Sequence, residues 1–150
     1  MRLLPKMKKK KLKPFFLFAA ANASQTIISK SQIAQQKSSD NNILEVSKQI
    51  EINQNQLLQE ITTLANKKLI IITEINATHK RDLYDLIDAN ETNFNAAYLD
   101  SMNASLEEEI RLLESISKET NDQIILEMVL QYLPKQYEFV REIQKSRIVI

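Results

Sequence analysis

The chain of 150 residues contains no cysteine, no glycine and no tryptophan, and only three prolines. Without cysteine it has no disulfide framework, no thiol nucleophile, no thiolate metal site and no cysteine that a lipid could modify. Without glycine it has no Gly-rich loop to hold a phosphate. A sheet protein of this size would need glycine at some tight hairpin turns, whereas helices can be joined through Asn, Asp and Ser. These absences favour an all-helical chain.

Charge is divided unevenly along the sequence. Residues 1–23 hold seven bases and no acid, and removing these seven from the 20 bases of the chain leaves 13 against 19 acids. The remainder therefore carries a net charge of about −6, so a basic leader precedes an acidic body. The seven bases are Arg2, Lys6, Lys8, Lys9, Lys10, Lys11 and Lys13.

The leader has the organisation of a secretory signal. Its basic start is followed by an apolar core from Phe15 to Ala21, and small residues stand at Ala21 and Ala23. We expect cleavage after Ala23, which makes residues 1–23 a signal peptide and residues 24–150 a single domain. The mature protein is then periplasmic or secreted.

Two alternatives to this interpretation of the leader stay open. Met7 offers an alternative start, because the sequence from Met7 onward matches the organisation of a signal more closely by itself. The leader could also be a retained basic tail that touches anionic lipid or nucleic acid. The apolar core of seven residues is far below the about 20 that a membrane-spanning helix needs. No permanent membrane span is therefore expected.

The clearest helical pattern lies between Phe94 and Ile116. Its apolar residues recur at steps of four and three, which places them on one face of a helix. Acids and amides fill the opposite face, so one side of this helix is expected to be buried. The inward residues are Phe94, Tyr98, Met102, Leu106, Ile110 and Leu113.

A second helix is expected between the cap residues Ser39 or Asp40 and Lys67. Its apolar stripe contains one polar position, Gln54, three residues before Leu57. A buried amide needs hydrogen-bond partners, because an unsatisfied one costs about 1–3 kcal/mol. We interpret Gln54 as a satisfied core amide and not as a ligand. The rest of the stripe is Ile43, Val46, Ile50, Leu57, Ile61 and Leu64.

Three further helices complete the predicted bundle. The first covers Ser24–Ser38, a short one covers Ala77–Asp88, and the last runs from about Asp122 to Lys145 with a kink expected at Pro134. The only histidine, His79, is interpreted as a packing or surface residue. Asn76 and Asn90 are expected to cap the third and fourth helices, and Leu69–Ile72 to be a connection packed on the bundle. The inward residues of these helices are predicted to be Ile27, Ile28, Ser31, Ala34, Leu83, Leu86, Ile87, Ile125, Met128, Val129, Tyr132, Gln136, Phe139, Val140 and Ile143.

Three motifs resemble a known family. FNAAYLDSM (Phe94 to Met102), ANKKL (Ala65 to Leu69) and YLPKQYEFV (Tyr132 to Val140) are similar in order and spacing to domain of unknown function 4142. The resemblance covers roughly Ser24 to Ile143. It implies an exported bacterial protein with a ferritin-like antiparallel four-helix bundle and a role in envelope or stress physiology. The residue pattern itself adds one short extra helix between the second and third long helices.

The same resemblance points to positions where this chain departs from the family. The family pattern places an Asp-His pair at Asn53-Gln54 and a second pair at Ser105-Leu106. It places a further histidine at Phe139 or its neighbour Glu138. All of these histidines are replaced here, so metal or proton chemistry at these positions is not expected.

The sequence predicts no catalytic, cofactor-binding or metal-binding residues. Di-iron sites of ferritin-like proteins use Glu-x-x-His pairs, and none is present. The consecutive acids Glu107, Glu108 and Glu109 fan around their helix and are expected to form a solvated face. We therefore favour a non-enzymatic exported bundle that acts through its surface on another protein or a second copy, without a nucleic-acid partner. The alternative is a divergent metal or redox protein that uses carboxylates alone, for instance Glu51, Glu107 and Glu138.

Overall fold

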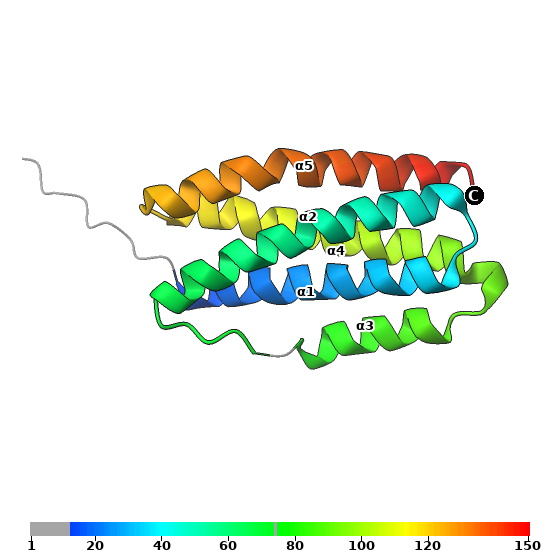
Figure 1. The fold of residues 1–150 in the computed structure, drawn as a ribbon, viewed down its shortest axis with the longest axis horizontal. Helices are drawn as coiled ribbons and strands as arrows, with labels where there is room; N and C mark the ends of the chain where they lie inside the picture. Colours follow the sequence, from blue (N-terminus) through cyan, green and yellow to red (C-terminus); the bar gives the residue numbers. More distant parts are fainter. Residues whose placement is uncertain (1–12, 74) are drawn as a thin grey trace, which may run out of the picture.

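The computed structural model describes residues 13–73 and 75–150, and this part of the chain forms five α-helices and no strand (Figure 1). The predicted all-α bundle, with four long helices and a short extra helix between the second and third of them, is therefore confirmed. The helices are α1 (Pro14–Lys37), α2 (Asn41–Lys67), α3 (Ala77–Asp88), α4 (Glu91–Glu119) and α5 (Gln123–Ile148).

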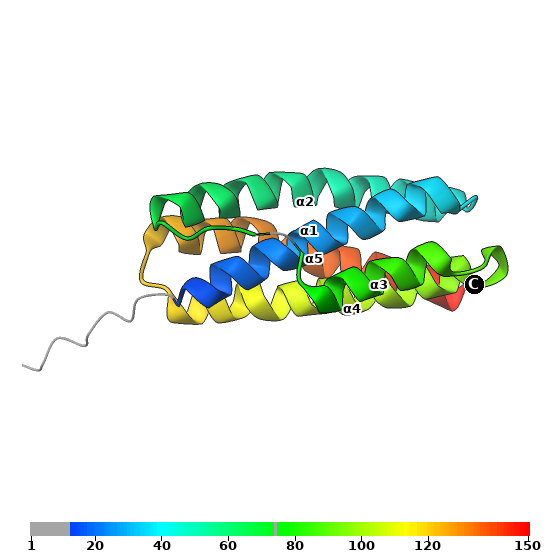
Figure 2. The same cartoon turned by 90° about the horizontal axis from the view of Figure 1, so that it is seen from below.

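The four long helices form a bundle in which neighbours run antiparallel. α1 packs against α2 and α4, and α5 packs against the same two helices (Figure 1). The connection 68–76 and α3 carry the chain back along the bundle, so that α4 starts at the same end as α2 (Figure 2). α3 lies outside the bundle against α1 and α4.

Asparagine and aspartate start the helices that follow loops. Asp40 Oδ1 accepts from the backbone N–H of Ile43 at 3.0 Å, Asn76 Oδ1 from that of His79 at 2.9 Å and Asn90 Oδ1 from that of Asn93 at 3.1 Å. These three bonds satisfy N–H groups that the first turn of a helix leaves free. The predicted caps of α2, α3 and α4 are confirmed.

α1 begins ten residues earlier than predicted, at Pro14 and not at Ser24. Proline is favoured at the first helical position, where its missing N–H costs nothing and its φ is already helical. The added turns bury Leu17, Ala20 and Ala21 completely. The apolar stretch assigned to the leader thus forms the first half of α1.

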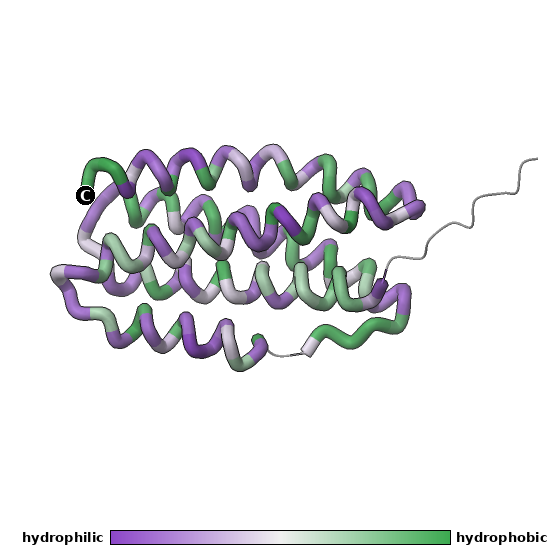
Figure 3. The backbone as a smooth tube through the Cα atoms, turned by 180° about the vertical axis from the view of Figure 1, so that it is seen from behind, coloured by the Kyte–Doolittle hydropathy of each residue, from purple (hydrophilic) through white to green (hydrophobic). Residues whose placement is uncertain are grey.

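Two apolar clusters fill the interior, one in each half of the bundle, and the tube in Figure 3 shows apolar positions alternating with polar ones along every long helix. The near core lies at the end where α1 begins, and the far core at the end where α1 finishes. Members of the near core are Leu17, Ala20, Ala21, Leu57, Ile61, Leu64, Leu113, Ile116, Ile125, Met128, Val129 and Tyr132. Members of the far core are Ile27, Ala34, Ile43, Val46, Ile50, Leu86, Phe94, Tyr98, Leu99, Met102, Leu106, Phe139 and Ile143.

The predicted inner faces of the long helices are confirmed. The connection packs on the bundle only in part, because Ile70 and Ile72 contact the near core whereas Leu69 and Ile71 are exposed. The short helix α3 also differs from its prediction. Ile87 is 49% exposed, so only Leu86 of its predicted face is fully inward. α5 continues through Pro134 as one helix, and the residue four before it, Leu130, is exposed. None of the described helices is long and apolar enough to cross a membrane.

Candidate functional site

A layer of polar side chains crosses the middle of the bundle, and each long helix contributes one of them. The polar layer consists of Ser24 of α1, Gln54 of α2, Glu109 of α4 and Gln136 of α5, and each of them is 0% exposed. On every helix the layer residue lies between a member of the near core and a member of the far core. The layer therefore divides the apolar interior into two halves.

Hydrogen bonds join the layer into one network. Ser24 Oγ donates to Gln54 Oε1 at 2.9 Å. Gln54 Nε2 donates to Glu109 Oε1 at 2.7 Å and to Gln136 Oε1 at 2.8 Å. Gln136 Nε2 in turn donates to Asn53 Oδ1 at 2.9 Å. The prediction that Gln54 is a satisfied core amide is confirmed, and Asn53 and Gln54 both belong to the network.

The prediction of a solvated acid run is wrong for one of its three members. Glu107 is exposed and Glu108 partly exposed, but Glu109 is completely buried. Consecutive residues of a helix point about 100° apart, so three in a row cannot all face solvent beside a wide inner stripe. Glu109 stands three residues after Leu106 and four before Leu113, which is the spacing of that stripe. This spacing was the signal in the sequence that could have located it.

Burial makes Glu109 a neutral acid. Removal from water raises the pKa of Glu109 to about 8, while the hydrogen bond from Gln54 acts in the opposite direction and the nearby charge of Glu108 raises it further. At neutral pH the carboxyl therefore holds its proton. Its Oε2 atom is buried and has no hydrogen-bond partner among the described residues. The polar layer is uncharged, and a metal ion could use this carboxyl only after the proton has left.

A second polar cluster lies between α1, α3 and α4. Lys30 is 1% exposed, and its Nζ donates to Ser105 Oγ at 2.6 Å and to the carbonyl of Ser101 at 3.2 Å. The carboxylate of Asp82 on α3 lies 3.9 Å from the same ammonium group. Burial lowers the pKa of Lys30, and the charges of Asp82 and Glu108 act against this change. The cluster thus supplies hydrogen-bond and charge partners for the buried amino group of Lys30.

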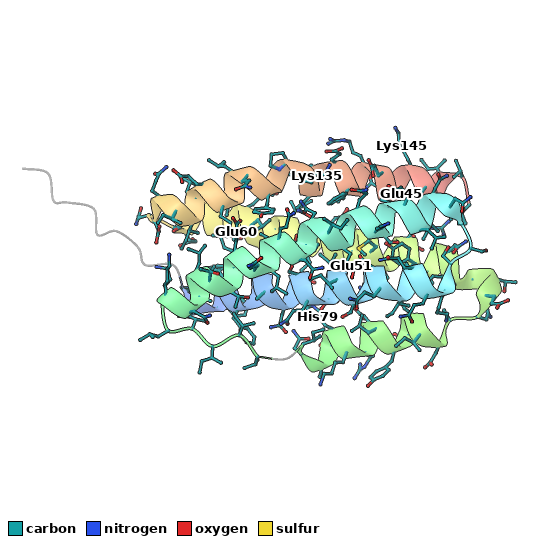
Figure 4. All side chains as sticks on the ribbon, in the orientation of Figure 1. Glu45, Glu51, Glu60, His79, Lys135 and Lys145 are labelled. Atoms are coloured by element: carbon teal, nitrogen blue, oxygen red, sulfur yellow. The ribbon has the colours of Figure 1, made fainter. Side chains whose placement is uncertain are left out.

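His79 belongs to the same interface. It lies in the first turn of α3, on the side toward the bundle (Figure 4). Its Nε2 atom is 3.4 Å from Glu108 Oε1, and its Nδ1 atom is buried without a partner among the described residues. At the other end of α3, Lys37 Nζ donates to the carbonyls of Leu86, Ile87 and Ala89 at 3.2, 2.6 and 2.8 Å. Polar contacts therefore attach both ends of α3 to the bundle.

The contact between Lys30 and Ser105 has the composition of a serine–lysine catalytic pair. Sequence spacing carries no signal for this contact, because 75 residues separate the two positions. Both members of the pair are buried, however. Ser105 is 6% exposed, and the described surface pockets are lined by other residues.

The carboxylates proposed for a divergent metal site do not converge. Glu51, labelled on α2 in Figure 4, accepts hydrogen bonds from two glutamines of α1 at 2.9 and 2.8 Å. Glu107 is exposed and accepts from an asparagine one turn earlier at 3.4 Å. Glu138 lies 3.4 Å from a lysine of its own helix. Within the described residues no group of three or more His, Cys, Asp or Glu side chains could hold a metal ion.

Comparison with known proteins identifies the family but adds no relative of known function. Neither the curated proteins nor the solved structures contain a match. The family model for DUF4142, a domain of unknown function, matches residues 5–145, a range that contains the polar layer, the Lys30 cluster and all of α1 to α4. The chain therefore belongs to the DUF4142 family.

Proposed function

We propose that the protein is a non-catalytic helical bundle that is exported and acts through its outer surface in envelope or stress physiology. The observation that supports this proposal is that buried polar side chains are hydrogen-bonded to one another. The polar side chains of the polar layer and of the Lys30 cluster bind one another, and none of them is among the residues that line the described pockets. Buried polar groups that are bound in this way fix the packing of helices and need no substrate to account for them.

The outer surface offers the remaining means of action. Large apolar side chains are exposed there, among them Tyr84 at 63%, Leu130 at 61% and Ile124 at 58%. Exposed apolar side chains are a feature of surfaces that bind proteins when they gather into patches. We propose another protein or a second copy of the chain as the partner.

Reactivity of Ser105 tests the non-catalytic proposal. The folded protein is treated with a fluorophosphonate, which reacts with activated serine hydroxyls, and its intact mass is measured. Because Ser105 is closed off and its neighbour Lys30 is held by other contacts, we expect no adduct. Stoichiometric labelling that disappears in Ser105→Ala would show an activated nucleophile and overturn the proposal.

Export is supported by the seven bases and the absent acids of residues 1–23. Fractionation of the native host tests it. We expect the protein in the periplasm or the medium, and recovery in the cytoplasm alone would contradict export.

We also propose that the bundle is ferritin-like. One long crossover, formed by the connection 68–76 and α3, links two pairs of antiparallel helices, and ferritin-like folds have one such crossover. An experimental structure whose long helices superimpose on a ferritin-like bundle in the same chain order would support this relationship. A different order of the helices would contradict it.

A further inference from the structure

The near core is a trough on α2, α4 and α5 that the first turns of α1 cover. Leu17, Ala20 and Ala21 are 0% exposed and belong to this core. Its other members are nine residues of α2, α4 and α5. Without the first half of α1, the inner sides of these nine would face water, at a cost of about 25 cal/mol for each Å² of apolar surface.

The amino acids of this half of α1 suit a close helix–helix contact. Alanine occupies positions 19, 20, 21 and 23, and small side chains let neighbouring backbones approach one another. Large side chains are placed accordingly, because Leu17 is buried whereas Phe15 is 64% exposed. A hydrophobic stretch that served only to cross a membrane would have no reason to sort its side chains by face.

Specific hydrogen bonds continue through the expected cleavage site. Asn22 is 1% exposed, and its Oδ1 accepts from the backbone N–H of Asn76 at 3.0 Å. This bond attaches the residue that caps α3 to α1. Thr26 Oγ1 donates to the carbonyl of Asn22 at 2.9 Å, and Ser24 belongs to the polar layer. Residues on both sides of the bond between Ala23 and Ser24 are therefore built into the interior.

The family match is an independent observation on the same segment. The DUF4142 model begins at residue 5, well before Phe15. The stretch 15–23 is therefore part of the sequence pattern that defines the domain, and a leader outside the domain would not be.

From these observations we propose that residues 15–23 are the permanent occupant of the trough and remain on the working protein as the first half of α1. The proposal does not rest on the proposed function. It opposes cleavage after Ala23, and it holds whether or not the protein is exported. Fractionation tests export, whereas the experiments below test whether residues 15–23 are retained. Either proposal can therefore fail while the other holds.

Truncation tests the structural half of the proposal. Three proteins are compared by thermal unfolding: the full chain, a chain without residues 2–13 and a chain without residues 2–23. We expect the first two to melt cooperatively at the same temperature. The third should lose cooperative melting or melt more than about 10 °C lower, because it lacks Leu17, Ala20 and Ala21. Equal melting of all three would overturn the proposal.

Two point variants of the full chain test the same proposal if either truncated chain does not express. Leu17→Ala should lower the melting temperature by several degrees, whereas Phe15→Ala, two residues earlier and exposed, should leave it unchanged. Equal melting of both variants with the full chain would overturn the proposal. The intact mass of protein from the native host completes the test. We expect a mass that includes residues 15–23, and a chain that starts at Ser24 would contradict it.

Discussion

Gln54 Nε2 and Glu109 Oε1 lie 2.7 Å apart at the centre of the bundle, and their hydrogen bond joins α2 to α4 between two apolar cores. The same nitrogen also bonds to Gln136 of α5. A shift of α2 by one helical turn would move Gln54 into an apolar core and leave these partners unsatisfied, which costs about 1–3 kcal/mol for each group. The polar layer therefore favours one register of the four long helices.

The carboxyl of Glu109 makes stability depend on pH. Its pKa is about 8 in the folded protein against 4.5 for a free glutamate. Between these values the folded state holds a proton that the unfolded state has released, so the free energy of unfolding falls as pH rises from 4.5 to 8 and the loss is complete above 8. Glu109→Gln removes this titration. We expect urea unfolding at pH 5 to 9 to show a flatter profile for Glu109→Gln and a gain of a few kcal/mol at pH 9.

Glu107→Gln is the matched control for this experiment. It makes the same chemical change two residues earlier on the exposed face of α4. Its profile should follow that of the unchanged protein within about 0.5 kcal/mol. Parallel profiles for Glu109→Gln and the unchanged protein would show that Glu109 is ionised in the fold.

Leu106 tests the orientation of α4. It is 0% exposed in the far core, so Leu106→Ala should lower the free energy of unfolding by about 2–5 kcal/mol. Leu130→Ala is its control, because Leu130 is 61% exposed and should change the free energy by no more than about 0.5 kcal/mol. Denaturant titration measures both values. A change below about half a kcal/mol for Leu106→Ala would mean that α4 is rotated differently.

Leu69, which follows α2, has a strained backbone conformation that glycine would adopt without strain, and the chain contains no glycine. Its φ is 59°, in the left-handed region, and its side chain is 91% exposed. Left-handed backbone costs a non-glycine residue about 1–2 kcal/mol, and glycine is the usual residue at this position after a helix. Leu69→Gly should therefore raise the free energy of unfolding by about 1 kcal/mol. Ile71→Gly is the control, at an exposed position with negative φ, and it should lower the free energy of unfolding slightly. If both variants changed the free energy of unfolding by the same amount, Leu69 would not be strained.

The fold can be predicted from the sequence because the apolar stripes are long and the residues that cap the helices are typical capping residues. Buried positions such as Phe94, Met102 and Phe139 recur at helical spacing, and Asp40 and Asn90 mark helix starts. The start of α1 is harder to predict. An apolar stretch after a run of lysines satisfies the pattern of a signal and that of a buried helix equally well, and only the contacts of Leu17 distinguish them.

The polar interior was predicted only in part for a related reason. Gln54 interrupts an otherwise apolar stripe, so it stood out, and Gln136 was assigned inward with its neighbours. Glu109 is difficult to recognise as buried because it stands in a run of acids. The burial of Lys30 is difficult to predict because its partners Ser105 and Asp82 lie on other helices. Local spacing reports which face a residue occupies, but the partner of a buried charge depends on how distant segments pack.

The last prediction concerns metal ions. Iron, zinc and manganese are bound by imidazoles and carboxylates, and the polar layer contains one carboxyl, Glu109, which holds its proton at neutral pH. The other layer side chains are two amides and a hydroxyl that already bond to one another. We therefore expect excess Fe²⁺, Zn²⁺ or Mn²⁺ to leave the melting temperature unchanged, since an ion that binds only the folded state must raise it. Elemental analysis after dialysis accompanies the melting curves. A stoichiometric ion that survives dialysis, raises the melting temperature and is lost in Glu109→Gln would place a metal site in the layer and restore the divergent metalloprotein hypothesis.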